Sequence, residues 1–225
     1  TSLYVKGTLN NSGSISGKVH ICGESSLGYN NAYFKMEMQA IKGYGTYTDI
    51  YFENNHKKGV LLLDSFTVTD FVSNTDKRIQ NSVNLTLTDN CIIESGYLNS
   101  GATLKNFTSS QAVTFNGEVN LAGEVALQSE CVFNDSLIIS EDCTSLSQSG
   151  VTVKGDLFLN GGSISGLGAV NLRGNFSANT DSPVINNLQL CGLQSQIIDS
   201  NSELTVNTLV NNHKSVGGVT FDCTV

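Results

Sequence analysis

The chain has few basic residues, one proline and no tryptophan among its 225 residues. Two arginines and ten lysines face 20 acidic residues, which leaves a formal charge of −8. Nucleic acids and anionic membranes are recognised by clustered basic side chains, so this composition argues against both as partners. The sequence also lacks a run of about twenty apolar residues, which argues against insertion into a membrane.

Closely spaced cysteine pairs are missing as well. The six cysteines are scattered along the chain, at Cys22, Cys91, Cys131, Cys143, Cys191 and Cys223. Structural zinc sites need close pairs of ligands, so we predict no metal site, and nothing in the sequence indicates a cofactor. Whether Cys22, Cys91, Cys191 and Cys223 form disulfides stays open at this level.

Small neutral residues take the place of charged ones. Only 14% of the residues are charged, about half the usual share, whereas asparagine, serine and glycine supply about a third of the chain. The hydrophobic content of 39% is too high for a disordered polymer. The composition therefore indicates a folded, acidic and largely non-helical protein.

A six-residue repeat between Gln111 and Leu146 is the clearest pattern in the sequence. Cut into hexads, it reads QAVTFN, GEVNLA, GEVALQ, SECVFN, DSLIIS and EDCTSL. Apolar residues recur at the third and fifth places, which lie on the same face of a strand, and turn-forming residues separate the strands. We expect Val113, Val119, Val125, Leu137 and Val151 to be buried, and Glu118, Glu124 and Lys154 to be exposed.

A short period sustained over many residues is typical of a solenoid. Three hexads would close a roughly triangular coil of about 18 residues. We therefore predict an all-β fold, a right-handed parallel β-helix that forms a single domain over residues 1–225. An irregular excursion is expected at about 30–55, where aromatic and methionine residues interrupt the hexads.

Several phrases of the sequence resemble bacterial repetitive surface proteins. They are VTVKGDLFLNGG from Val151, LAGEVAL from Leu121 and YVKGTL from Tyr4. Such runs build right-handed β-helices in filamentous-haemagglutinin-like adhesins, and a similar hexad builds the cytoskeletal bactofilins. The resemblance covers residues 111–177 well and the remainder loosely. It implies attachment to a host surface or glycan, but it supplies no binding residues.

Three tyrosines form the candidate binding site. Tyr44, Tyr47 and Tyr51 lie in a segment rich in glycine and threonine, outside the regular hexads. Sugars stack on exposed aromatic rings while hydroxyl and amide groups bond their hydroxyls, so these tyrosines suggest carbohydrate binding. Packing of the same tyrosines against a coil is the competing interpretation.

Catalytic residues are not apparent. Polysaccharide-cleaving β-helices use paired carboxylates, and the candidates here are Asp64, Asp70, Asp76, Asp89, Asp135, Asp142 and Asp156. Asp135, Asp142 and Asp156 fall in corners, where aspartate is a favoured turn residue. We read His20, His56 and His213 as surface or turn residues, and we predict no catalytic residue.

The cysteines allow a sharper expectation. Cys131 and Cys143 lie 18 residues after Val113 and Val125, so each should stack on a valine of the preceding coil. Because they belong to different sides of the triangle, we predict that they are not bonded to each other.

The functional hypothesis is a non-enzymatic, adhesin-like module of a bacterial cell surface, extracellular and part of a larger or processed chain. Its partners would be carbohydrate or a host surface protein, with no nucleic acid and no membrane insertion. The alternatives are a polysaccharide lyase or hydrolase and a self-assembling structural solenoid.

Overall fold

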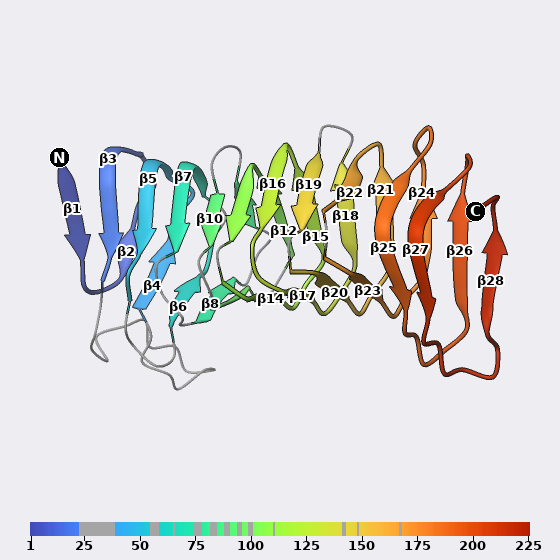
Figure 1. The fold of residues 1–225 in the computed structure, drawn as a ribbon. Coiled ribbons are helices and arrows are strands. Elements are labelled where there is room, and N and C mark those ends of the chain that lie inside the picture. Colours follow the sequence, from blue (N-terminus) through green and yellow to red (C-terminus); the bar gives the residue numbers. More distant parts are fainter. Residues whose placement is uncertain are drawn as a thin grey trace.

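The computed structural model describes most of the chain, and the strands stack along one axis with the termini at opposite ends (Figure 1). The described residues are 1–22, 39–54, 59–64, 66–73, 78–81, 85–87, 91–93, 96–98, 101–109, 111–140, 143–147, 149–166 and 168–225. Every strand pairing in this part of the chain is parallel. The structure confirms the predicted β-solenoid.

Three ladders of strands make up three faces, which confirms the triangular coil. The first face runs through β1 (Ser2–Val5), β3 (Ser14–Ile21), β5 (Thr46–Phe52), β7 (Thr67–Ser73), β10 (Cys91–Ile93), β13 (Phe107–Ser109), β16 (Glu124–Leu127), β19 (Thr144–Ser147), β22 (Ser163–Ser165), β25 (Val184–Leu190) and β27 (Thr205–Asn211).

The second face consists of β2 (Leu9–Asn10), β4 (Gln39–Lys42), β6 (Val60–Leu62), β8 (Arg78–Asn81), β11 (Gly96–Leu98), β14 (Val113–Phe115), β17 (Cys131–Phe133), β20 (Val151–Val153) and β23 (Val170–Leu172), which also joins β25. The third face consists of β9 (Leu85–Leu87), β12 (Ala102–Lys105), β15 (Val119–Ala122), β18 (Leu137–Ser140), β21 (Leu157–Asn160), β24 (Phe176–Ala178), β26 (Gln196–Ser200) and β28 (Val219–Asp222).

The core fills the space between the three faces with the side chains that the hexads predicted. Val113, Val119 and Val125 are fully buried, and Leu137 and Val151 are almost so. The predicted outward residues, Glu118, Glu124 and Lys154, are exposed. The two buried positions of each strand, which are separated by one outward residue, thus stack from coil to coil into two columns of core per face.

The coil length varies between turns. The paired residues Thr114 and Val132 are 18 positions apart, as predicted, but Cys131 and Val151 are 20 apart. The extra residues fall in the corner between β18 and β19, where the Cys143 N–H donates to the Ser140 carbonyl at 2.9 Å. A corner can lengthen without disturbing the ladders, because only the strands must keep their register.

The longer coil corrects one expectation about the cysteines. Cys131 follows the register of β14 and β17, which places it opposite Val113. Cys143 does not stack on Val125, because β19 pairs with β16 so that Ser145 lies opposite Val125. Both thiols are nevertheless buried and free, so the predicted absence of a bond between them is confirmed.

The segment at about 30–55, where an irregular excursion was expected, contributes paired strands in the part that the structure describes. Residues 39–42 form β4 and residues 46–52 form β5, and both strands pair with coils before and after them. Aromatic side chains there obscure the hexad without breaking the ladder. Residues 30–38 and 55 lie outside the described residues.

Candidate functional site

The three tyrosines singled out from the sequence do not form one surface. Tyr47 is fully buried, so it cannot stack on a sugar, and its inclusion in the site is corrected. Burial raises the pKa of Tyr47, and the nearby Asn11 side chain opposes that shift. Tyr44 is 77% exposed, and Tyr51 is half-buried on the outside of β5.

A local slip in alternation separates Tyr47 from Tyr51. Strict alternation would place residues four apart on the same face of a strand. In β5, however, the buried positions are Tyr47, Ile50 and Phe52, so one extra residue intervenes after Tyr47. The neighbouring strand β3 carries a register shift between Ile15 and Lys18, and Tyr51 consequently faces outward.

Tyr51 belongs instead to a stack of rings on the first face, which we call the aromatic surface: Tyr4, His20 and Tyr51. These residues are direct neighbours in the register of β1, β3 and β5. The ring centroids are 4.5 Å apart for Tyr4 and His20 and 5.0 Å apart for His20 and Tyr51, with interplanar angles of 13° and 14°. The rings are therefore nearly parallel, and Tyr4, at 63% exposure, ends the stack.

Charged groups order this stack. The His20 Nδ1 lies 3.2 Å from the Glu53 Oε2, with the His20 side chain 14% exposed. The Lys18 ammonium lies 5.5 Å from the Tyr51 ring centroid, a distance suited to a cation–π contact. The Asp49 backbone pairs with that of Lys18 on the adjacent strand, two residues before Tyr51. The rings are thus held in place before any ligand binds.

Sequence reasoning missed this surface because it treated His20 alone. His20 follows Tyr4 by 16 positions and precedes Tyr51 by 31, and neither interval matches the 18-residue coil. The outward position of His20 was correctly predicted. The signal in the sequence is an aromatic residue at the equivalent strand position of each coil, but the coils differ in length, so a fixed period does not reveal it.

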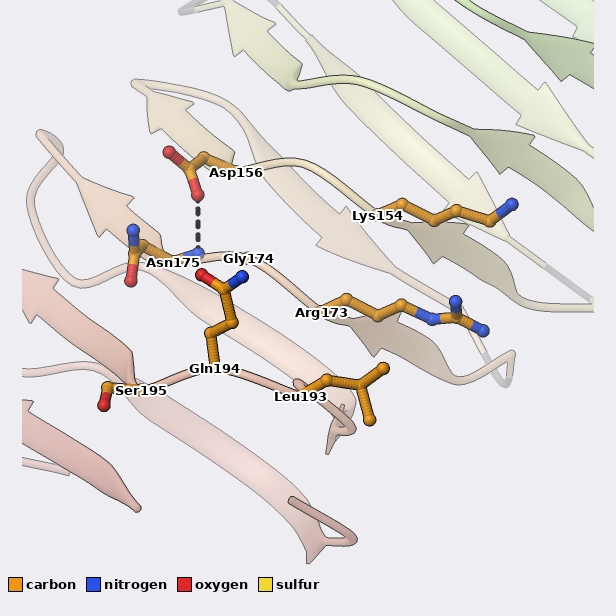
Figure 2. Close-up of a pocket in the computed structure, with 8 residues that line it drawn as sticks. All are labelled: Lys154, Asp156, Arg173, Gly174, Asn175, Leu193, Gln194 and Ser195. Atoms are coloured by element: carbon orange, nitrogen blue, oxygen red, sulfur yellow. Dashed lines mark hydrogen bonds between the residues drawn. The ribbon is translucent and has the colours of Figure 1, made fainter. Parts of the chain in front are cut away.

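A second surface feature is a cleft at the corner between the second and third faces (Figure 2). We call it the corner cleft; its volume is about 420 Å³, and it is lined by Lys154, Asp156, Arg173, Gly174, Asn175, Leu193, Gln194 and Ser195. Figure 2 shows the ends of Lys154 and Arg173 on one side and the Asp156 carboxylate on the other. The cleft therefore has a cationic end and a polar end.

The described aspartates bond to backbone at turns. Asp64 accepts from the Gly43 N–H at 2.8 Å, Asp135 from the Ser136 N–H at 2.8 Å, and Asp156 from the Asn175 N–H at 2.7 Å. Each carboxylate satisfies a donor where the chain bends. Asp76, Asp89 and Asp142 lie outside the described residues, as does the side chain of Asp70.

The histidines also have structural contacts. His213 Nε2 lies 2.6 Å from the Gln194 carbonyl oxygen, and its Nδ1 accepts from the Ser215 N–H at 3.3 Å. These contacts tie one turn to the next, which agrees with the interpretation of His213 as a turn residue. His56 lies outside the described residues.

Metal ligands, membrane-spanning helices and disulfides can each be assessed in the described part of the chain. No group of three potential metal ligands occurs there. The same residues include no helix long and apolar enough to cross a membrane. Cys22, Cys191 and Cys223 are free and half-buried, whereas the side chain of Cys91 is not described.

Comparison with known proteins gives no relative: no family model, no curated protein and no solved structure matches the chain.

Proposed function

We propose that this chain is a non-enzymatic, adhesin-like module of a bacterial cell surface that binds carbohydrate through its aromatic surface. The observation that supports the proposal is the ordered stack of Tyr4, His20 and Tyr51 on the outside of the solenoid. The cell-surface location rests on the resemblance of the hexad phrases to bacterial surface repeats.

The chemistry of the stack suits a sugar. A pyranose ring packs its C–H face on an aromatic ring while its hydroxyls bond nearby polar groups. Tyr4 offers the most exposed ring of the stack, and the Lys18 ammonium lies beside Tyr51. Because neighbouring rings and Glu53 restrain these side chains, binding would immobilise few of them, which favours affinity.

The aspartate contacts favour a binder over an enzyme. A glycosidase needs one carboxylate as acid and another as base or nucleophile, both facing the same substrate. Asp64, Asp135 and Asp156 are each engaged with a backbone N–H at a corner. Their positions are explained by turn formation, without a catalytic role.

A glycan array probed with the purified chain tests the proposal. The Tyr4→Ala variant should lose about tenfold or more in affinity for the bound glycan, because a stacked aromatic ring is lost. Tyr44→Ala is the matched control, since Tyr44 is an exposed tyrosine outside the stack. If the chain binds the glycan without cleaving it, the amount of reducing ends should be the same with and without the protein.

Two results would contradict the proposal. Loss of binding in Tyr44→Ala but not in Tyr4→Ala would assign recognition to the tyrosine favoured by the sequence alone. Release of reducing ends would support the polysaccharide-degrading alternative.

A self-assembling solenoid is the second candidate, favoured by the exposed ends of the rod. Inward positions of the terminal coils are open, with Leu3 at 42% and Leu209 and Phe221 at 41% exposure. Exposed lysines, Lys6 and Lys18, mark the N-terminal coils, whereas exposed Glu203 and Asp222 mark the C-terminal ones. Opposite charges at the two ends would favour head-to-tail stacking of copies.

Light scattering over a range of protein concentrations tests the second candidate. Assembly should raise the mean mass with concentration, and Leu209→Lys should abolish that increase by placing a charge in the end-to-end contact. Ile197→Lys is the control. Ile197 is 50% exposed and lies between two buried residues of β26, so its side chain points outward from the face of the solenoid. A constant monomeric mass would exclude assembly.

A further inference from the structure

Lys154 and Arg173 occupy equivalent places in consecutive coils. Each residue directly follows a strand of the second face, and Val153 pairs with Leu172 immediately before them. The backbone is fixed at both points, because the Lys154 N–H donates to the Phe133 carbonyl at 2.8 Å and the Arg173 N–H to the Val153 carbonyl at 2.9 Å. Two cationic side chains therefore leave adjacent rungs, about 4.8 Å apart along the rod.

This placement is unfavourable without a counter-charge. Like charges at neighbouring positions on adjacent strands repel each other. Among the described residues, no carboxylate lies within ion-pair distance of Lys154 or Arg173. Asp156 lines the same cleft, but its Oδ1 accepts from the Asn175 N–H, and Figure 2 shows its carboxylate on the side away from the two cations. An anion bound between the two side chains would relieve their repulsion.

The facing wall of the cleft is held rigidly. It is the turn Leu193–Ser195, which leads into β26. Buried Gln196 anchors this turn: its Nε2 donates to the carbonyl oxygens of Leu172 at 3.3 Å and Gly174 at 2.5 Å, and its Oε1 accepts from the Gly192 N–H at 3.0 Å. The turn and the Arg173 corner are consequently locked together.

Gly174 lets two neighbouring corners approach each other closely beside the cleft. A Cβ on Gly174 would lie 2.3 Å from the Gly155 carbonyl oxygen and 2.5 Å from the Asp156 Oδ1, closer than real contacts allow. The successive corners therefore lie against each other with no side chain between them.

We propose that the corner cleft binds one acidic sugar residue, a monosaccharide unit that carries a carboxylate. The planar guanidinium of Arg173 matches a carboxylate in two-point geometry, and Lys154 adds a second charge. Leu193, at 70% exposure, offers an apolar contact for the C–H face of the ring. Exposed Gln194 and Ser195 supply partners for hydroxyls.

The rest of the cleft argues for a single acidic unit. Asp156 at the opposite end would repel a second anionic group, and the net charge of −8 disfavours long polyanions. A volume of about 420 Å³ is the size of a small-ligand site. This site is separate from the aromatic surface, and it stands or falls independently of the proposed function.

Titration of the isotope-labelled full chain with sodium glucuronate, followed by amide NMR, tests the proposal. Glucuronate should shift the signals of Lys154, Arg173, Gly174 and the turn Leu193–Ser195, whereas glucose at equal concentration should not. Arg173→Gln should weaken glucuronate binding by about tenfold, because a charge-assisted pair is lost. Lys6→Gln is the matched control, since it removes one exposed positive charge far from the cleft and should leave binding unchanged.

The remaining outcomes would overturn the proposal. Equal shifts with glucose and glucuronate would show that the carboxylate is not recognised. Acetate or sulfate binding as tightly as glucuronate would show a simple anion site without a sugar contact. Wild-type affinity in Arg173→Gln, or an equal loss in Lys6→Gln, would place the binding elsewhere or reduce it to net charge. The amide spectrum of Arg173→Gln reports directly whether that variant is folded.

Discussion

Two buried glutamines perform the same task at opposite ends of the rod. Gln39 donates from its Nε2 to the Val5 and Gly7 carbonyls, as Gln196 does to the Leu172 and Gly174 carbonyls. In both cases one amide bonds two carbonyls that are two residues apart in a corner of an earlier coil. A long neutral side chain thus donates to the Gly7 and Gly174 carbonyls at the corners. It also adds a second donor for the Val5 and Leu172 carbonyls, which already accept from the Cys22 and Cys191 N–H groups.

Replacing Gln196 with methionine should therefore destabilise the protein strongly. The apolar side chain removes the bonds that Gln196 makes to the Gly174 carbonyl and the Gly192 N–H, whereas the Leu172 carbonyl keeps the Cys191 N–H as a partner. We expect a loss of about 3 kcal/mol in the free energy of unfolding. Gln128→Met is the control, because Gln128 is exposed. Chemical denaturation measures both, and equal effects of the two variants would contradict the role assigned to Gln196.

The Cys131 thiol should make stability fall at alkaline pH. Burial raises the pKa of Cys131, the Glu130 carboxylate adds to the rise, and hydrogen bonds with Val113 and Ser109 oppose it. Below the thiol's ordinary pKa of about 8.5, both folded and unfolded states hold the proton. Above it, the unfolded state loses the proton first, so stability decreases as pH rises toward the folded-state pKa, by up to about 1.4 kcal/mol per pH unit.

Cys131→Val removes this dependence, and the comparison isolates one thiol from the others. Valine occupies the same core column at Val113 and Val151, so the variant should be about as stable as the wild type at pH 7. Denaturation at pH 7.5 and 9.5 should show a smaller loss in Cys131→Val. The same loss in both proteins would show that the Cys131 thiol does not contribute.

At the scale of the strands, equivalent side chains stack on one another. The Phe115 and Phe133 rings lie 4.9 Å apart with an interplanar angle of 4°, because β14 and β17 place them in register. On the outside, the Asn134 amide donates to the Asn116 side chain, and the Asn201 amide to that of Asn179. The high asparagine content is explained in part by these outward pairs.

Corners constrain the chain in two ways, through the backbone φ angle and through the space available for a Cβ. Alanine substitution at three glycines should separate these two effects. A Cβ on Gly13 would lie no closer than 3.9 Å to another group, so Gly13→Ala should change stability by less than about 1 kcal/mol. Gly218 has a φ of +67° with open space around it, and Gly218→Ala should cost about 1–2 kcal/mol from backbone strain alone.

Gly43→Ala should be the most damaging of the three. Its φ is +93°, and a Cβ would lie 2.1 Å from the Asn11 carbonyl oxygen, so strain and a backbone clash combine. We expect a loss of about 3 kcal/mol or more. Thermal unfolding of the three variants gives the ranking, and a Gly43→Ala variant as stable as Gly13→Ala would show that the corner can relax.

At the scale of the whole molecule, stability should be uneven along the rod. Each coil contacts only its neighbours, so a terminal coil has one partner and an inner coil has two. Inward residues of inner coils, such as Phe133 and Leu157, are fully buried, whereas Leu209 and Phe221 near the C-terminus remain 41% exposed. Local opening should therefore start at the ends.

Hydrogen exchange followed by mass spectrometry tests this gradient. Amides of β14 to β21 should exchange at least about a hundredfold more slowly than those of β1, β27 and β28, because opening an inner coil breaks contacts on both sides. Uniform protection along the rod would indicate a single cooperative unit. Protection of β1 and β27 that rises with protein concentration would instead support end-to-end assembly.

The sequence by itself determined the parallel solenoid, its three-sided coil and the buried residues between Val113 and Val151. A repeated pair of apolar positions buries its side chains only if both point inward from the same face of the strand, and this holds for every coil. The same local pattern cannot report corner length, since extra corner residues leave the strands unchanged. Cys143 therefore does not stack on the expected valine, and Tyr47 points inward where the alternation of β5 is interrupted.

Only the tertiary structure decided which outward side chains meet. The aromatic surface joins Tyr4, His20 and Tyr51 from coils of unequal length, and the corner cleft joins Lys154 and Arg173 with a turn some twenty residues further along. Outward positions are free of the packing constraint that makes inward ones periodic. Their neighbours are set by the register between coils, which depends on every corner of each coil.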